Sequence, residues 1–530
     1  MQVHPVLIAG QWRESAAQGT FQAEDPAEQR TIDDLYPMSS WADADAALAA
    51  AAAAADEMRL LEPARIAAFL EAYAARIEAR KSELVEMANR ETALPKSPRL
   101  ADNELPRTSN QLRLAAAAAR EGSWALPTID TNLDIRSLHA AIGPVCIFGP
   151  NNFPLAFNAI SGGDFAAAVA AGNPVIALGH PCHPNTTRLL AEEASAAACQ
   201  TGMPAAAVQL LYRLSYADGE RLVADPRIAA VAYTGGRASG LKLKTCADRV
   251  GKPIYLELSS INPVVILPGA LAERSAKIAD EFTTSCLSGT GQFCTNPGFL
   301  LLLRGPLTDA FITAVVERFR SAPVGTLLSR GVCESLARGV ASLRSAGAEL
   351  LVGDADGGGR GYSRSNTLLR ATGDAFLRSP ADMQSEAFGN ASLIVVADDI
   401  AQAARVLRHF EGNLTGTIYS ESRGGEETEY AAIAAQLRPR VGRLLDDKMP
   451  TGVAVSTAMN HGGPYPATGH PGFTSVGIPA SLRRFSMLQC FDNVRQSRLP
   501  AALRDRNPGG GTWRLVDGQW TTGDVKPRNS

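Results

Sequence analysis

The sequence predicts an α/β protein of more than one domain, built on parallel β-sheets. A chain of 530 residues is too long for a single hydrophobic core. Its composition, 45% hydrophobic and 20% charged residues, is typical of a globular protein. From Ile142 onward, short apolar runs of strand length alternate with helix-like segments, which indicates a parallel sheet covered by helices.

The central region supplies most of these elements. Helices are expected at 163–171, at 185–200 and after Gly240, and strands at 144–149, 174–178, 207–211, 228–233, 254–258 and 263–267. Ligands of such sheets bind at the carboxyl ends of the strands. A site is therefore expected at the loops near Asn152, Leu178, Gly235 and Glu257.

The flanking regions differ in pattern. Residues 5–40 indicate strands and turns, whereas the Ala-, Leu-, Glu- and Arg-rich stretch that follows indicates helices at 43–90 and 103–121. Residues Thr128 to Ala141 alternate like an exposed strand pair and are expected to form an arm. A second α/β unit is expected from about Ala270 to Val455, with helices near 272–288, 308–321 and 400–410.

Charge and cysteine usage exclude several classes of protein. The net charge of −3, with no long basic run, does not support nucleic-acid binding. No apolar stretch reaches the ~18 residues of a membrane span, and no signal-peptide pattern opens the chain. None of the eight cysteines forms a Cys-x-x-Cys pair, which favours reduced thiols and a cytoplasmic location.

One cysteine stands out as a candidate nucleophile. Cys294 follows the small-residue run Ser288-Gly289-Thr290-Gly291 and precedes an Asn-Pro turn, so the backbone there can approach a ligand closely. The alternative is a buried structural cysteine, because free Cys mostly behaves as a small hydrophobe. Cys286, in an apolar helical stretch, fits that structural role better than Cys294.

Six motifs stand out along the chain: FGPNNFP (148–154), YTGGRASG (233–240), YLELSSINP (255–263), GTGQFCTNPG (289–298), SEAFGN (385–390) and PTGV (450–453). Together they resemble the aldehyde dehydrogenase superfamily over nearly the whole chain. Each is weak alone, but their order and spacing match the family. The variants ELSSINP, HPCHPNT and HGGPYPAT resemble the α-ketoglutaric semialdehyde (2,5-dioxovalerate) dehydrogenase branch.

The resemblance implies a fold of two domains with a small β oligomerisation arm. Residues 1–127 and 143–262 would form a Rossmann-type dinucleotide-binding domain, and 263–455 an α/β catalytic domain. Residues 128–142 and 483–498 would form the oligomerisation elements of a homodimer or homotetramer, followed by a C-terminal tail at 499–530.

The resemblance also implies three catalytic roles. Cys294 would form a thiohemiacetal and then a thioester with the aldehyde, and Asn152 would donate to the oxyanion. Glu257 would activate the water that hydrolyses the thioester. The alternatives are a turn-shaping role for Asn152 and a solvated surface position for Glu257, which lies between Leu256 and Leu258.

A nicotinamide dinucleotide, NAD or NADP, is the implied cofactor. Gly235 and Gly240 match the loop that approaches the pyrophosphate at a helix N-terminus, and Phe148 belongs to the same group of cofactor-side positions. Glu386 matches the glutamate that binds the nicotinamide ribose, and Phe388 lies at that end. The alternative for Glu386 is a solvated loop carboxylate.

Leu178 departs from the family pattern. The family normally has a lysine there, which contacts the adenosine ribose or 2′-phosphate. Loss of a charged hydrogen bond costs ~1.5–3 kcal/mol, which weakens the case for a strong NADP preference. Arg213 or Arg237 could supply a cation instead, a hypothesis that unchanged NAD and NADP affinities in their alanine variants would rule out.

Metal binding is not expected. His180, Cys182 and His183 resemble ligands only superficially, because no second cluster completes a tetrahedral set. His461, near the expected substrate entrance, receives no role from the sequence.

The predicted activity is NAD(P)-dependent oxidation of a small acidic aldehyde such as α-ketoglutaric semialdehyde to the acid. The alternatives are a dehydrogenase of longer aliphatic aldehydes and a non-catalytic scaffold on the same fold. Relative rates on acidic and fatty aldehydes distinguish the predicted activity from a dehydrogenase of longer aliphatic aldehydes. Titration with NAD+ and a thiol-directed aldehyde analogue distinguishes the enzyme from a non-catalytic scaffold.

Overall fold

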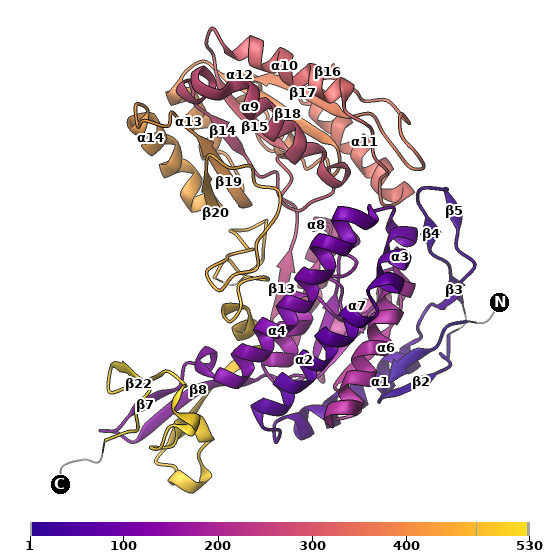
Figure 1. Ribbon diagram of the computed structural model, residues 1–530, viewed down its shortest axis with the longest axis vertical. Helices are drawn as coiled ribbons and strands as arrows, with labels where there is room; N and C mark the ends of the chain where they lie inside the picture. Colours follow the sequence, from indigo (N-terminus) through magenta and orange to yellow (C-terminus); the bar gives the residue numbers. More distant parts are fainter. Residues whose placement is uncertain (1–2, 18, 473, 527–530) are drawn as a thin grey trace.

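The computed structural model describes residues 3–17, 19–472 and 474–526, and its two larger sheets form the two lobes seen in Figure 1. The first sheet has the order β13-β12-β9-β10-β11-β1-β2. Its strands are β13 (Ile254–Glu257), β12 (Ala230–Thr234), β9 (Val145–Phe148), β10 (Val175–Leu178), β11 (Val208–Leu211), β1 (Val6–Ile8) and β2 (Gln11–Arg13). The pairs from β13 to β11 are parallel, and β1 and β2 join antiparallel. The predicted parallel sheet is confirmed.

The strand order contains a topological switch point. Successive strands β9, β10 and β11 extend the sheet in one direction, and β12 and β13 extend it in the other. Ligands of such sheets bind in the crevice outside the carboxyl ends of the strands where the order reverses. The loops after β9 and β12 therefore lie where a dinucleotide is expected.

Helices cover the first sheet. They are α1 (Trp41–Met58), α2 (Pro63–Ala79), α3 (Lys81–Thr92), α4 (Leu105–Glu121), α5 (Gly163–Ala170), α6 (Pro184–Thr201), α7 (Tyr216–Ala224) and α8 (Arg237–Asp248). The alanine run of α1 begins at a capping box, in which Ser40 and Asp43 each bond to the backbone N–H of the other. Every third or fourth alanine is buried, including Ala44, Ala47 and Ala51, so the run packs as a helix.

The second lobe contains a sheet of order β16-β17-β18-β15-β14-β19-β20. Its strands are β16 (Glu349–Val352), β17 (Thr367–Thr372), β18 (Ala391–Ala397), β15 (Phe299–Leu303), β14 (Val264–Ile266), β19 (Asn413–Tyr419) and β20 (Val441–Asp446). All pairs are parallel except that of the edge strand β16. β15 is buried on both faces, which accounts for its continuous apolar run.

Six helices pack on this sheet: α9 (Pro268–Leu287), α10 (Thr308–Ser321), α11 (Arg330–Ser345), α12 (Gly373–Arg378), α13 (Ile400–Arg408) and α14 (Glu427–Leu437). Small strands near the N-terminus complete the first lobe: β3 (Thr20–Phe21), β4 (Glu24–Asp25), β5 (Arg30–Thr31) and β6 (Tyr36–Pro37). The expected strands and turns of 5–40 and the helices of 43–90 are thus confirmed.

A third, five-stranded sheet projects from the first lobe (Figure 1). Its order is β21-β8-β7-β22-β23, with β21 (Ser486–Asp492), β8 (Ile135–Ala141), β7 (Thr128–Asp130), β22 (Arg514–Val516) and β23 (Gln519–Thr521). The expected strand pair at Thr128 to Ala141 is confirmed. The C-terminal residues also contribute two strands to this sheet, because the apolar patch around Trp513 and Trp520 folds as a hairpin.

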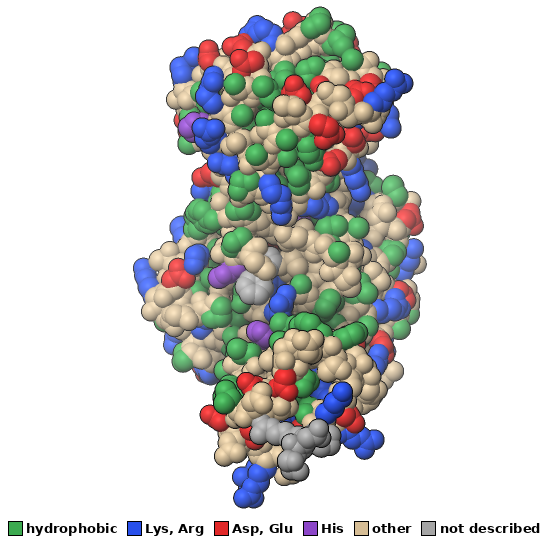
Figure 2. All heavy atoms as spheres, turned by 90° about the vertical axis from the view of Figure 1, so that its left-hand side faces the viewer, with side chains coloured by type: hydrophobic (Ala, Val, Ile, Leu, Met, Phe, Trp, Pro, Cys, Tyr) green, Lys and Arg blue, Asp and Glu red, His purple; other side chains and the backbone are tan. Residues whose placement is uncertain are grey.

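The chain between β20 and β21 returns to the first lobe. Leu258 donates its backbone N–H to Ala467, and Glu257 forms an isolated bridge with Thr468. This irregular segment therefore covers the end of β13. On the face in Figure 2, acidic and basic side chains are intermixed, in keeping with the net charge of −3.

Candidate active site

A cleft of about 950 Å³ lies where the two lobes meet. The loops after β9, β12 and β13 contribute to it from the first lobe, and the segments before β15 and β18 contribute from the second. Its lining includes Asn152, Gly235, Glu257, Cys294, Glu386 and Phe388. The structure thus brings together six of the nine site residues expected from the sequence.

Cys294 reaches the cleft at the end of a tightly folded loop. Gly289, Thr290 and Gly291 all have positive φ, and a Cβ on Gly291 would lie 2.0 Å from the carbonyl oxygen of Gly389. Only glycine fits at position 291, so the small-residue run has a steric cause. Cys286 is fully buried in α9, where burial raises its pKa to about 12, as expected of a structural thiol.

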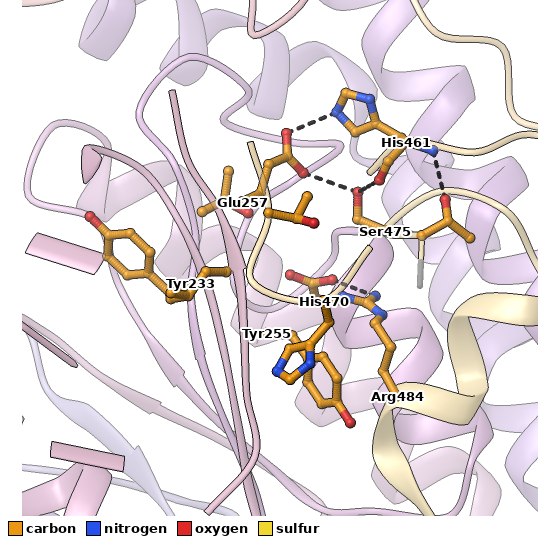
Figure 3. Close-up of a pocket in the computed structure, with 12 residues that line it drawn as sticks. Tyr233, Tyr255, Glu257, His461, His470, Ser475 and Arg484 are labelled. Carbon is orange, nitrogen blue, oxygen red and sulfur yellow. Dashed lines mark hydrogen bonds and ion pairs between the residues drawn. The ribbon is translucent and has the colours of Figure 1, made fainter. Parts of the chain in front are cut away.

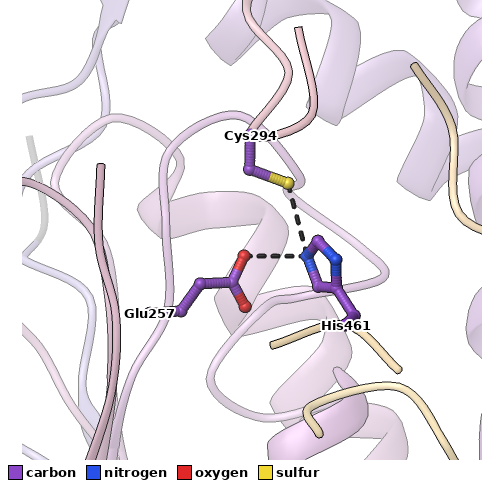
Figure 4. Close-up of side chains that lie close together, drawn as sticks. All are labelled: Glu257, Cys294 and His461. Atoms are coloured by element: carbon purple, nitrogen blue, oxygen red, sulfur yellow. Dashed lines mark hydrogen bonds and ion pairs between the residues drawn. The ribbon is translucent and has the colours of Figure 1, made fainter. Parts of the chain in front are cut away.

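Cys294, His461 and Glu257 form a contiguous group (Figure 4). The Cys294 Sγ lies 3.4 Å from His461 Nε2, and the same nitrogen lies 2.8 Å from Glu257 Oε1. Both His461 and Glu257 are buried, with exposed fractions of 2% and 5%. One imidazole nitrogen therefore faces the sulfur and the carboxylate together.

Charge coupling dominates this group. Burial lowers the pKa of His461, but the charges of Glu257 and Cys294 outweigh it and raise the pKa to about 10. Burial conversely raises the pKa of Glu257, but His461 and several hydrogen bonds hold it below its ordinary value. Both shifts favour the charged forms of the pair, an imidazolium and a carboxylate.

Hydrogen bonds from the returning segment fix this ion pair. Ser475 Oγ donates to Glu257 Oε2 at 3.0 Å and also lies 3.1 Å from the His461 carbonyl oxygen. Thr474 Oγ1 accepts the His461 backbone N–H at 2.7 Å. Figure 3 shows Glu257 between these groups, with Arg484 further along the same small cavity, whose volume is about 20 Å³.

Asn152 is buried beside the cysteine loop. Its Nδ2 donates to the carbonyl oxygen of Gln292 at 2.9 Å, two residues before Cys294. Arg99 Nη2 in turn donates to the Asn152 carbonyl at 2.9 Å. Asn152 is therefore held through its side chain by the cysteine loop and through its backbone by Arg99.

The expected cofactor residues divide into two sets. Gly235, Glu386 and Phe388 line the cleft, and the backbone N–H of Ser260 lies 3.4 Å from Glu386 Oε1. Burial raises the pKa of Glu386 to about 7. Gly240 does not line the cleft; a Cβ there would lie 2.5 Å from Leu258, so this glycine serves helix packing.

Phe148 and Leu178 also lie off the cleft surface. Leu178 is buried at the end of β10, and Phe148 packs against the Tyr233 ring. Of the two arginines considered as cation sources, Arg237 lines the cleft but is paired with Glu411 at 2.8 Å, and Arg213 does not line it.

Comparison with known proteins agrees with this geometry. The family model "Aldehyde dehydrogenase family" matches residues 12–458. The chain belongs to the aldehyde dehydrogenase family. It is 38% identical to alpha-ketoglutaric semialdehyde dehydrogenase 2 of Azospirillum brasilense, over 96% of this chain and 98% of that protein. It is 35% identical to alpha-ketoglutaric semialdehyde dehydrogenase of Acinetobacter baylyi, over 86% of each.

Solved structures of the family share the fold. A 1-pyrroline-5-carboxylate dehydrogenase from Thermus with bound NAD superposes with a TM-score of 0.80 at 22% identity, covering 92% of each chain. An aldehyde dehydrogenase from Pseudomonas syringae in complex with NAD+ and octanal gives a TM-score of 0.79 at 18% identity, covering 92% of this chain and 96% of that one. The resemblance to the family inferred from six motifs is confirmed.

His461 is the site residue that the sequence did not identify. It lies 167 residues from Cys294 and 204 from Glu257, in a segment without regular structure. The available signal was a lone histidine among glycines and prolines in the stretch NHGGPYP, next to the expected substrate entrance.

The HPCHP loop is structural and borders the cleft. His183 is buried, with Nε2 3.0 Å from the Pro150 carbonyl oxygen, and His180 stacks on it with ring centroids 5.2 Å apart. Over the described residues, the donor atoms grouped closely enough for a metal ion are instead those of Glu257, Cys294 and His461, within 4.8 Å of one another.

Also within the described residues, none of the helices has the length and apolar character that crossing a membrane requires.

Proposed function

We propose that this aldehyde dehydrogenase oxidises α-ketoglutaric semialdehyde (2,5-dioxopentanoate) to the dicarboxylic acid, with NAD or NADP as the oxidant. The observation that carries the proposal is the contact of Cys294 with the buried His461–Glu257 ion pair inside the cleft. The substrate is supported by the names of the two relatives that are 38% and 35% identical.

The cleft suits a dinucleotide. It lies at the switch point of the first sheet, its volume of about 950 Å³ is at the upper end for ligand sites, and Gly235 and Gly236 line it at the N-terminus of α8. Glu386, with its carboxyl group in the cleft, can accept hydrogen bonds from ribose hydroxyls. When bound, the nicotinamide accepts a hydride from the substrate carbon.

Cys294 begins the reaction. Its thiolate, beside the His461 imidazolium, forms a bond to the aldehyde carbon, and the electron pair of the C=O bond moves to the oxygen. The Asn152 amide and the Cys294 backbone N–H can donate to that oxygen, because Asn152 is already held next to the loop of Cys294. Loss of hydride from this adduct leaves a thioester.

Glu257 and His461 complete the reaction. Glu257 accepts a proton from water as the water oxygen bonds to the thioester carbon. The carbon–sulfur bond then breaks, its electron pair returns to the sulfur, and the new thiolate again lies beside the imidazolium. The proton on Glu257 passes to solvent and the new carboxylic acid ionises, so two protons are released for each aldehyde oxidised at neutral pH.

A matrix of coenzymes and aldehydes tests the proposal. Purified protein and the Cys294→Ala variant are assayed for NADH or NADPH formation with α-ketoglutaric semialdehyde, succinic semialdehyde and unbranched neutral aldehydes. We expect turnover only in the wild type, and fastest with α-ketoglutaric semialdehyde. An inactive wild type across the panel, or an active Cys294→Ala variant, contradicts the proposed function.

We also propose that the protein acts as a homodimer or homotetramer in the cytoplasm, with the domain division expected from the sequence. The edge strand β21 supports self-association, because it exposes Met487 and Leu488 on an unpaired sheet edge. The eight unpaired cysteines support a reducing compartment. Light scattering of the purified protein tests the subunit number.

A further inference from the structure

Two arginines from different lobes bind the loop at 450–453. Arg107 is on α4, and Arg443 is on β20. Burial lowers the pKa of both guanidinium groups, and the charge of Cys294 opposes this effect in each case.

A chain of ring contacts connects Arg107 to the catalytic group. Its guanidinium carbon lies 5.0 Å from the centroid of the Phe157 ring, and that ring lies 5.8 Å from the His461 ring. His461 contacts Cys294. Phe157 belongs to an apolar cluster with Phe153 and neighbouring residues, so apolar side chains surround the ring between Arg107 and His461.

Both arginines hold the same loop. Arg107 Nη1 donates to the Val453 carbonyl at 2.9 Å, and Arg443 Nη2 donates to the Pro450 carbonyl at 3.0 Å. These partners are neutral. A carboxylate is a stronger partner for a guanidinium group, because both members of the pair are charged and the geometry allows two parallel hydrogen bonds.

The charges of this region do not balance without a ligand. Arg99 pairs with Glu104, and His461 pairs with Glu257. Within the described residues, neither Arg107 nor Arg443 has a carboxylate within salt-bridge distance. Arg107 Nη2 and Arg443 Nε are sequestered from solvent, and in the described part of the chain neither has a hydrogen-bond acceptor.

A buried guanidinium nitrogen without a hydrogen-bond acceptor needs an explanation, because such a group destabilises the fold unless a ligand accepts its hydrogen bond. We propose that Arg107, reinforced by the charge of Arg443, binds the carboxylate at the far end of the substrate and selects aldehydes that carry one. The inference rests on the proposed function. In α-ketoglutaric semialdehyde three carbons separate the aldehyde carbon from the carboxylate, and in the structure one aromatic ring, that of Phe157, separates Arg107 from the catalytic histidine.

The test compares an acidic with a neutral aldehyde of the same chain length. The kcat/KM values for succinic semialdehyde and butanal are measured in the wild type and in Arg107→Gln, and their ratio is taken. Loss of one charged hydrogen bond predicts that this acid-to-neutral ratio falls by about 10- to 150-fold. Arg443→Gln is expected to lower the ratio less, because it acts through its charge.

Arg113→Gln is the matched control. Arg113 is on the same helix, six residues further on, and pairs with Glu78 at the protein surface. We expect its ratio to equal that of the wild type. A ratio unchanged in Arg107→Gln, or lowered as much in Arg113→Gln, overturns the inference.

Two further outcomes are informative. If Arg107→Gln does not fold, Arg107→Lys is measured in its place, because lysine keeps the charge but loses the paired hydrogen bonds. An acid-to-neutral ratio equal to that of the wild type in Arg107→Lys overturns the inference as well. The proposed function fails separately, since a wild type that oxidises neither aldehyde contradicts it. A wild type that oxidises both without preferring the acid contradicts only the role of the arginines.

Discussion

His461→Gln is the substitution that tests the catalytic group most directly. The imidazolium is removed while a side chain of similar reach remains, so the cysteine loop and the returning segment keep their packing. The variant separates a histidine that stabilises the thiolate from one that only fills space beneath Glu257. The structure allows the size of the effect to be worked out from two distances.

At an effective dielectric constant of about 20, opposite charges 3.4 Å apart attract by about 4.9 kcal/mol, the value for the His461–Cys294 contact. The Glu257 oxygen lies within 4.8 Å of the sulfur, so it repels a thiolate by at least about 3.5 kcal/mol. The net attraction of the pair for a negatively charged sulfur is thus at most about 1.4 kcal/mol, which corresponds to about tenfold in the reactivity of Cys294.

The effect of His461→Gln depends on Glu257. If the carboxylate takes up a proton once its partner is gone, both terms vanish and thiolate reactivity falls by about tenfold. If the carboxylate stays ionised, the repulsion remains and the fall is larger. The double variant His461→Gln/Glu257→Gln removes both charges in either case, so it is expected to lose about tenfold.

The assay is the rate of alkylation of Cys294 by iodoacetamide at pH 7, followed by mass spectrometry of the peptide that contains it. Peptide-level detection is required because Cys199 and Cys490 are also exposed. His409→Gln, an exposed histidine at the end of α13, is the control. Alkylation of Cys294 at the wild-type rate in His461→Gln refutes the reasoning.

Three further predictions follow from the same geometry. Because the folded-state pKa of His461 is raised from 6.5 to about 10, the stabilisation that comes from protonated His461 is complete below pH 6.5 and is lost as the pH rises through 10; it amounts to at most about 5 kcal/mol. Urea midpoints at pH 7 and pH 9.5 should therefore differ more in the wild type than in His461→Gln, and equal differences contradict this. Asn152→Ala is expected to lower kcat by ~10²–10³-fold while Cys294 alkylation persists, and an unaltered kcat excludes the amide from oxyanion stabilisation. Gly291→Ala should destabilise the fold by ~1–3 kcal/mol, because residue 291 has a positive φ and an added Cβ would contact the Gly389 carbonyl. Gly219→Ala in α7 should instead stabilise the fold by ~0.4–1 kcal/mol, because the space around Gly219 is open. Urea unfolding of both variants checks the contrast.

The sequence was most informative where local pattern and tertiary environment agree. The apolar runs at 145–148 and 175–178 form buried parallel strands, because strands covered on both faces must be apolar throughout. The glycines before Cys294 are required by positive φ and by close backbone contact, so a small-residue run predicted the loop correctly. These features depend on neighbours in the chain, which a sequence shows directly.

Features that depend on distant segments were not predictable in the same way. The strands β22 and β23 need the partner strand β7, nearly 400 residues earlier, to form a sheet. Leu178 and Phe148 match cofactor-side positions in sequence, but their side chains pack into the interior and against Tyr233. Sequence position identifies the loop, whereas the direction of each side chain depends on packing that no local pattern encodes.

The single nitrogen of His461 links the two halves of the reaction. Nε2 lies 3.4 Å from the sulfur and 2.8 Å from the carboxylate, so its N–H is shared between two anions. When Cys294 bonds to the aldehyde, its negative charge leaves the sulfur and that N–H interacts with Glu257 alone. This makes Glu257 a weaker base while the thioester forms. Glu257 therefore accepts the proton of the attacking water while it is still paired with His461, and the thiolate regains its contact with that N–H when the carbon–sulfur bond breaks.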